Sequence, residues 1–274
     1  MNKTLLMLAL VSFLSLGLLA SGSHAARTTG RSGFMMFNSR DLIGAPVRDS
    51  HGELMGVINE VMVDSEGHAL AVLNHGDSDL TGSAGINTPV PFEELRISET
   101  KAGKEIVALK TDMEHLDFAP YLDPFRMDSR RYESSIYEYY GISPKWTQSV
   151  STGKGEFKEL NSFDLVGAAV ENSSGKIIGI VNEVMVDSGG HAFAIVNHGD
   201  YDLYGEDGVN TPVPLQELQI SQPKGGQDIV RLKTDTEHLD LAPYFDPLQT
   251  NSRQYEASIY EYYGIQPSWT QSGK

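Results

Sequence analysis

The sequence predicts a mainly β protein made of two tandem small β-barrels, each followed by a short α-helical, aromatic-rich extension. Two observations lead to this prediction. The chain repeats itself at an offset of 123 residues, without a gap from Phe34 to Ser149. Within each repeat, short runs of β-branched residues alternate with turn residues, as in small barrels. The period is much longer than that of a solenoid, so each copy reads as a complete domain.

The repeat also sets the expected domain organisation. Recurring segments include "NEVMVDS", "NHGD", "NTPVP", "LKTD" and "SIYEYYGI". Between the copies lies the Ser- and Gly-containing segment "VSTGKG", which is typical of a linker. We expect a signal peptide over 1–25, a flexible lead-in over 26–33, a first barrel over 34–113 with its extension over 114–149, a linker over 150–156, and a second barrel over 157–236 with its extension over 237–274.

The strands of each barrel follow from turn residues and β-branched runs. The turn Asp64-Ser65-Glu66-Gly67 separates two apolar runs and predicts a hairpin. The prolines of "NTPVP" bias the preceding residues towards extended backbone. In the first repeat we expect strands over 45–48, 57–63, 68–73, 88–91, 95–97 and 106–109.

The extension of each repeat should be helical. Thr111 with Glu114, and Thr234 with Glu237, have the spacing of a capping box. A longer helix is expected over 129–140, where aromatic and aliphatic residues recur on one face. Gly141 and Gly264 follow this helix at the position that favours a left-handed C-terminal residue.

Composition and the first residues indicate an exported protein. The chain has no cysteine, so its core must be stable without disulfides. An apolar run from Leu5 to Ala20 precedes Ser23-His24-Ala25, which has the small residues of a cleavage site. We expect cleavage after Ala25 and a periplasmic or secreted product without membrane insertion; an uncleaved anchor helix is the alternative.

The net charge opposes nucleic acid as a partner. The chain carries −16, and loss of the single charge of Lys3 gives −17 after cleavage. Nucleic-acid binding depends on neutralising phosphates, so a strongly acidic chain is unsuited to it. The charge favours cationic protein partners instead.

Two short segments suggest a serine esterase. Gly76-Asp77-Ser78 resembles the nucleophile block of GDSL-type esterases, and Asp112 and His115 have the spacing of the other two triad members. The second repeat has Tyr201 in place of Ser78. We therefore expect no enzyme activity and no catalytic residues, with a GDSL-like esterase as the least favoured alternative.

The same loops offer weak candidates for a cation site. Asp77 and Asp79, with Asp200 and Asp202 in the second repeat, resemble the start of a calcium loop. A threonine stands where that loop needs a bidentate glutamate. The alternatives are a cation or small-ligand module using loops 77–82 and 200–207, and turns stabilised by the aspartates. His68 and His75 lie seven residues apart and should face opposite sides of a strand, so no shared zinc site and no cofactor are expected.

The aromatic residues of the extensions have two interpretations. They either pack onto their own or the sister barrel, or form a surface that binds a protein partner, where tyrosine and tryptophan are favoured. The candidates for partner binding are Tyr137, Tyr140, Trp146, Tyr260, Tyr263 and Trp269. Barrel–barrel self-association is the other contact to be expected.

The stretch "DLIGAPVRDSHGELMGVINEVMVDSEGHALAVLNHG" resembles the PRC-barrel domain. "NTPVPFEEL" is similar to that family's Val-Pro-aromatic segment, although the second repeat has Leu215 at the aromatic position. The family includes the cytoplasmic part of the photosynthetic reaction centre H subunit and a ribosome maturation factor. The resemblance implies a small all-β barrel used for binding or assembly, without catalysis. It leads us to expect a non-catalytic exported adaptor or scaffold.

Overall fold

The computed structural model describes residues 35–76, 85–99, 105–127, 129–143, 159–199, 208–221 and 229–267. Both repeats belong to one compact unit that begins at residue 32. Among the described residues, no helix is both long and apolar enough to cross a membrane.

Each repeat builds one curled sheet, a half-barrel in form. In the first repeat the strand order is β5-β4-β3-β2-β7-β6. Only β2 and β7 run parallel; the other neighbours along this order are antiparallel. The strands are β2 (Pro46–Arg48), β3 (Leu54–Asp64), β4 (Ala69–His75), β5 (Ile86–Pro91), β6 (Leu95–Glu99) and β7 (Glu105–Leu109).

The second repeat has the same sheet. Its order is β12-β11-β10-β9-β14-β13, again with one parallel pair, β9 with β14. The strands are β9 (Ala169–Glu171), β10 (Ile177–Asp187), β11 (Ala192–His198), β12 (Val209–Pro214), β13 (Leu218–Ser221) and β14 (Ile229–Leu232). The mainly β prediction and the hairpin around Gly67 are therefore confirmed. The sheet is a half-barrel rather than a closed ring, since the two strands at the ends of its order do not pair with each other among the described residues.

The hairpin turn between β3 and β4 requires glycine at position 67. Gly67 has a φ of +82°, which side chains rarely adopt. A Cβ there would also lie 2.8 Å from the side chain of Gln216, which belongs to the other repeat. The turn is thus fixed both by backbone conformation and by its close approach to the second repeat.

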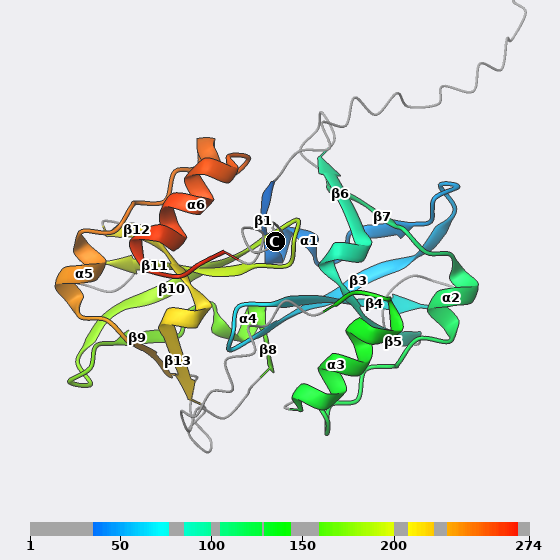
Figure 1. Ribbon diagram of the computed structural model, residues 1–274, viewed down its shortest axis with the longest axis horizontal. Coiled ribbons are helices and arrows are strands. Elements are labelled where there is room, and N and C mark those ends of the chain that lie inside the picture. Colours follow the sequence, from blue (N-terminus) through cyan, green and yellow to red (C-terminus); the bar gives the residue numbers. More distant parts are fainter. Residues whose placement is uncertain are drawn as a thin grey trace, which may run out of the picture. The chain divides into compact units, whose positions relative to one another are not determined.

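The two repeats exchange their first strands, which the sequence analysis did not predict. β1 (Met36–Asn38) precedes the first repeat in the chain but pairs with β10 of the second. β8 (Glu159–Asn161) precedes the second repeat but pairs with β3 of the first. Figure 1 shows β8 beside β3, at the end of that strand. Both strands lie within the expected ranges 34–113 and 157–236, but each pairs with the sheet of the other repeat.

The larger of two hydrophobic clusters extends through both repeats. It contains Phe37 and Leu160 of the exchanged strands, together with apolar side chains from both sheets such as Val63 and Val186. A second cluster lies under the helix of the first extension and includes Met62, Leu70 and Ile136. Separating the repeats would expose the shared core, so their association is part of the fold.

Short helices follow the exchanged strands. α1 (Ser39–Leu42) and α4 (Ser162–Leu165) are capped by Asn38 and Asn161, whose side chains accept a hydrogen bond from the backbone amide two residues later. Short 3-10 turns η1 (Phe92–Glu94), η2 (Leu215–Glu217) and η3 (Pro247–Gln249) complete the connections.

The first helix of each extension is capped one residue later than predicted. α2 (Met113–Asp117) has Asp112 as its N-cap, and α5 (Thr236–Asp240) has Asp235. Each carboxylate accepts a hydrogen bond from the amide of His115 or His238. The proposed threonine caps are therefore wrong, because aspartate occupies the cap position itself.

The longer helices agree with the prediction. α3 (Arg130–Tyr139) begins after the N-cap Ser129, and α6 (Arg253–Tyr262) begins after Ser252. Gly141 and Gly264 follow them with φ values of +67° and +68°. These helices bring their first turns over the β3–β4 and β10–β11 hairpins, where charged side chains meet.

Candidate functional site

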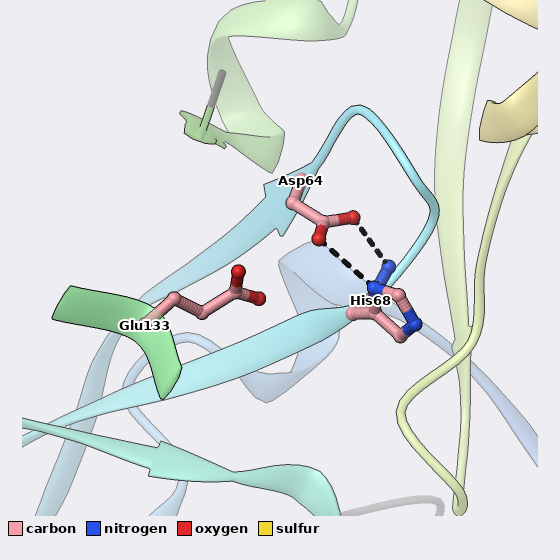
Figure 2. A group of neighbouring side chains, drawn as sticks. All are labelled: Asp64, His68 and Glu133. Carbon is pink, nitrogen blue, oxygen red and sulfur yellow. Dashed lines mark hydrogen bonds and ion pairs between the residues drawn. The ribbon is translucent and has the colours of Figure 1, made fainter. Parts of the chain in front are cut away.

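A buried cluster of charged side chains lies at the β3–β4 turn of the first repeat. Asp64 ends β3, His68 follows the turn, and Glu133 projects towards them from α3, as Figure 2 shows. Nδ1 of His68 lies 2.9 Å from Oδ2 of Asp64. The Nη1 atom of Arg130 donates to Asp64 at 3.2 Å and to Glu133 at 2.9 Å.

Local sequence explains how these groups are held. Oδ1 of Asp64 accepts hydrogen bonds from the amides of Glu66 and His68, each at 2.8 Å, so the aspartate closes its own turn. Arg130 and Glu133 are three residues apart on α3 and therefore lie on one face of the helix. We call Asp64, His68, Arg130 and Glu133 the first charged cluster.

The second repeat reproduces this arrangement with Asp187, His191, Arg253 and Glu256, which we call the second charged cluster. Nδ1 of His191 lies 2.9 Å from Oδ2 of Asp187. Arg253 Nη1 donates to Asp187 at 3.2 Å and to Glu256 at 2.8 Å. Two independent copies of one buried geometry show that the sequence specifies it.

Both clusters lie where the repeats join. His68 and His191 face each other across an isolated antiparallel bridge. The amide of Ala69 donates to the carbonyl of Gly190, and that of Ala192 to the carbonyl of Gly67, each at 2.8 Å. The exchanged strands begin at the same place, since Asp64 pairs with Glu159 and Asp187 with Met36.

The two carboxyl groups of each cluster differ in protonation. Burial and the neighbouring Asp64 charge raise the pKa of Glu133 to about 10. Burial and Asp187 raise the pKa of Glu256 likewise to about 10. Burial would raise the pKa of Asp187 too, but the charge and hydrogen bond of His191 lower it to about 2. At neutral pH each cluster therefore pairs an ionised aspartate with a protonated glutamate.

The clusters differ in the acids that surround them. Burial and the charges of Glu93, Glu133, Asp64 and Glu159 raise the pKa of Tyr137, which marks these carboxylates as its neighbours. Glu66 adds an ion pair with Arg130. At the positions equivalent to Glu66 and Glu93 the second repeat has Gly189 and Gln216, and the residue of β1 equivalent to Glu159 is Met36. The first cluster is therefore the more acidic one.

The donor atoms of each cluster suit a metal ion as well as a hydrogen-bonded network. One imidazole nitrogen and two carboxyl oxygens lie within 4.8 Å of one another in Asp64–His68–Glu133 and in Asp187–His191–Glu256. Such mixed nitrogen and oxygen donors are typical ligands of Zn²⁺ and related ions.

A second feature of both repeats is an exposed apolar loop between the two helices of the extension. We call residues 118–125 and 241–248 the apolar loops. Their largest side chains are turned outwards at equivalent positions: Phe118 is 76% exposed, Tyr121 66% and Phe125 99%, and Leu241 is 72%, Tyr244 66% and Leu248 88% exposed.

These loops are held firmly although their side chains are exposed. The hydroxyl of Tyr132 donates to the carbonyl of Tyr121 and accepts from the amide of Asp123 at 3.2 Å. Tyr255 makes the same two contacts in the second repeat, at 2.8 and 3.1 Å. The amide of Leu122 donates to the carbonyl of Asn87 on β5 at 2.7 Å. The backbone thus fixes the outward orientation of each loop.

The structure changes the predicted partner residues. Tyr137 and Tyr260 are buried in the core, at 2% and 1% exposure, so they pack rather than present a surface. Tyr140 is half-buried and Tyr263 is buried, and both pack against the core. Trp146 and Trp269 lie outside the described residues. The aromatic side chains of the apolar loops are more exposed, and these residues were not among the predicted ones.

The remaining residues considered as catalytic or metal-binding candidates either lie outside the described residues or have structural roles. Ser78 and the four loop aspartates Asp77, Asp79, Asp200 and Asp202 lie outside the described residues. Asp112 caps a helix through the amide of His115, which gives these two residues a structural role. The His75 ring has contacts of its own: Nε2 lies 2.9 Å from the hydroxyl of Thr88, and Nδ1 lies 3.4 Å from Asp117.

Sequence reasoning missed both charged clusters, although a signal was present. Asp64, His68, Arg130 and Glu133 all recur unchanged at the 123-residue offset. Four ionisable residues that recur together are unusual on a variable surface. Their spacing along the chain, however, does not show that α3 returns to the β3–β4 turn.

Comparison with models of protein families gives two matches to the PRC-barrel domain, over residues 35–116 and 157–239. A search of curated proteins finds no match to this chain. The two family matches coincide with the two curled sheets and together cover well over half of the chain. The family inferred from the glycine and proline motifs is confirmed. The chain belongs to the PRC-barrel domain family, of which it carries two tandem copies.

Proposed function

We propose that this protein is a non-catalytic, exported adaptor that binds protein partners through its two apolar loops. The observation that carries the proposal is the outward display of large apolar side chains at equivalent positions of both repeats. Isolated exposed apolar residues are common on proteins, but a matched set on fixed loops is typical of an interaction site.

The chemistry of the loops suits a protein anchor. Burying one such side chain at an interface contributes roughly 1.5–3 kcal/mol. Phenylalanine and tyrosine lose little conformational freedom on binding, and the hydroxyl of Tyr132 already orders the loop around Tyr121. The partner surface is expected to be apolar at its centre, with a cationic rim that complements the net charge of −16.

The proposed function also includes export of the protein and the absence of catalysis. Export is supported by the apolar run and small-residue cleavage signal at the N-terminus. Absence of catalysis is supported by the family, whose members are generally non-enzymatic. Two loops per chain further support an adaptor, because two linked contacts bind with higher effective concentration than one.

The test combines site-specific crosslinking with affinity measurements. A photoreactive residue at position 125 or 248 should capture a protein in the exported fraction. The captured protein is then purified and its affinity measured for Phe125→Ser and Leu248→Ser. Each substitution should weaken binding by about tenfold or more, as expected for an anchor residue.

A matched control comes from the same duplication. Leu54 and Ile177 are equivalent, exposed and apolar, but lie on β3 and β10 outside the apolar loops. Leu54→Ser and Ile177→Ser should leave affinity unchanged, whereas Tyr132→Phe should weaken it by loosening the loop. The proposal would be refuted if loop and control substitutions weakened binding equally. It would also be refuted if the loop substitutions left the affinity unchanged.

A further inference from the structure

The second charged cluster has the donor groups of a metal site. One donor atom from each of Asp187, His191 and Glu256 lies within 4.8 Å of the other two. All three residues are buried, with exposures of 0, 6 and 0%. The ligands come from the β10–β11 turn and from α6, so two elements hold them in place.

The two carboxyl groups of the cluster face each other. Oε2 of Glu256 accepts from Arg253, and the protonated Glu256 carboxyl group forms a hydrogen bond with Asp187. Two carboxyl groups facing each other in a buried space need a proton or a cation between them. The raised pKa of Glu256, about 10, agrees with a proton in that position. A metal ion is the other species able to occupy it.

Arg253 now supplies positive charge to both carboxyl groups. Its Nη1 atom lies 3.2 Å from Asp187 and 2.8 Å from Glu256. The side chain is 40% exposed, so part of the Arg253 side chain reaches solvent. It therefore covers the site without sealing it.

We propose that Asp187, His191 and Glu256 bind a divalent transition-metal ion of the Zn²⁺ class. The ion takes the place of the proton between the two carboxyl groups, and Arg253 turns towards solvent. Nδ1 of His191 releases to solvent the proton that it donates to Asp187, and its lone pair then binds the ion. The carboxyl proton of Glu256 leaves to solvent, and water completes the coordination.

The first charged cluster serves as the matched comparison. There Arg130 is only 27% exposed and forms an ion pair with Glu66 in addition to its contacts with Asp64 and Glu133. Glu66 is replaced by Gly189 in the second repeat. The ion pair with Glu66 therefore holds the Arg130 guanidinium in place, and the guanidinium remains between the carboxyl groups of Asp64 and Glu133. The expected stoichiometry is one ion per chain.

The experiment is calorimetric titration of the complete mature chain with ZnCl₂ after treatment with a chelator. It is run in two buffers of different ionisation enthalpy, so that proton release is measured together with binding. One saturable site that releases at least one proton is expected. His191→Ala and Glu256→Gln should each weaken it by at least about 100-fold, whereas His68→Ala and Glu133→Gln should not.

Two exchanges between the repeats test the role of the guanidinium. Glu66→Gly gives the first repeat the residue of the second, and should raise the stoichiometry to two. Gly189→Glu makes the reverse change and should abolish binding. Gly189 does not have a positive φ, but a Cβ there would lie 3.1 Å from Cε1 and 3.3 Å from Nδ1 of His191, so Gly189→Ala is measured beside it to separate this contact from the effect of the carboxylate. Neither exchange removes a buried group, so both remain informative if His191→Ala fails to fold.

Two results would overturn the proposal. One is the absence of saturable binding, which would leave the proton as the occupant of the site. The other is binding that survives both His191→Ala and Glu256→Gln with unchanged affinity, which would place the ion elsewhere in the chain. Circular dichroism of each variant establishes that the titrated protein is folded.

Discussion

Asp64 and Glu133 carry the same functional group in the same buried cluster but respond to it in opposite ways. Asp64 accepts hydrogen bonds from two amides and contacts His68 and Arg130, and the His68 charge lowers its pKa in spite of burial. Burial and the Asp64 charge raise the pKa of Glu133 to about 10. One residue is therefore an ionised acceptor, and the other is a neutral carboxyl group at pH 7.

This difference predicts unequal costs of substitution. Asp64→Ala should destabilise the protein by about 3–5 kcal/mol, because it leaves buried donors and a guanidinium without their acceptor. Glu133→Gln should cost roughly 1 kcal/mol or less, since a neutral amide replaces a neutral carboxyl group. Urea denaturation measures both. Asp187→Ala and Glu256→Gln repeat the comparison in the second charged cluster. Equal losses of stability for the aspartate and glutamate variants of one cluster would contradict the assigned protonation states.

His75 and His198 predict a loss of stability on acidification. Burial lowers the pKa of each imidazole, and a nearby aspartate only partly offsets it. The unfolded state therefore binds protons more readily than the folded state. Their contribution is fully present above the unfolded pKa of about 6.5 and decreases as the pH falls below it.

The check is a comparison of unfolding free energies across that range. A His75→Gln, His198→Gln variant keeps a hydrogen-bonding group near Thr88 and Thr211 but does not titrate. The wild-type protein should lose more stability between pH 7 and lower pH than this variant. Parallel curves would show that the two histidines do not contribute.

At the scale of elements, the exchanged strands are short, but they pair with the ends of β3 and β10, next to the charged clusters. β1 contains only three residues, yet it pairs with Met185, Val186 and Asp187 at the end of β10. Asn38 of β1 also donates a side-chain hydrogen bond to Glu183 at 3.1 Å. The first residues of the first repeat thus support the sheet and charged cluster of the second.

Removal of residues 36–38 should therefore affect the distant repeat. Hydrogen exchange of the amides of 185–187 is expected to become faster, because their partner strand is lost. The amides of 62–64 should keep their protection, since they pair with β8. Faster exchange at 62–64 alone would reverse this assignment.

At the scale of the whole molecule, the repeats behave as two halves of one fold. Phe37 and Leu160 lie in the common core, and the His68–His191 bridge joins the two turns. Because β1 and β8 occupy equivalent positions at the 123-residue offset, β1 is suited to pair with a β3 strand as β8 does. A single repeat therefore contains both halves of the junction.

This equivalence predicts the behaviour of residues 35–143 expressed alone. They should form a homodimer in which β1 of each copy pairs with β3 of the other, since a lone repeat would expose its side of the core. Size-exclusion chromatography with light scattering measures the mass. A stable folded monomer would show that the exchange is dispensable.

Local features were predictable from the sequence, and non-local ones were not. The β3–β4 hairpin, helix α3 and the glycine after it were predicted, because strands, turn and caps are contiguous in the chain. The exchange of β1 and β8 was not, because three residues carry no periodicity and their partners are far away in sequence. The charged clusters were missed for the same reason, since Asp64 and Arg130 are 66 residues apart.

The exchanged strands also fix an order of events during synthesis. The partner of β1 is made about one repeat later, since Asn38 and Glu183 are 145 residues apart. The first sheet must likewise wait for β8 before its last ladder can form. Contacts over such separations carry a large loop-closure entropy and form slowly. The nascent chain therefore remains incomplete until the second repeat emerges, and folding is completed by the whole chain rather than repeat by repeat.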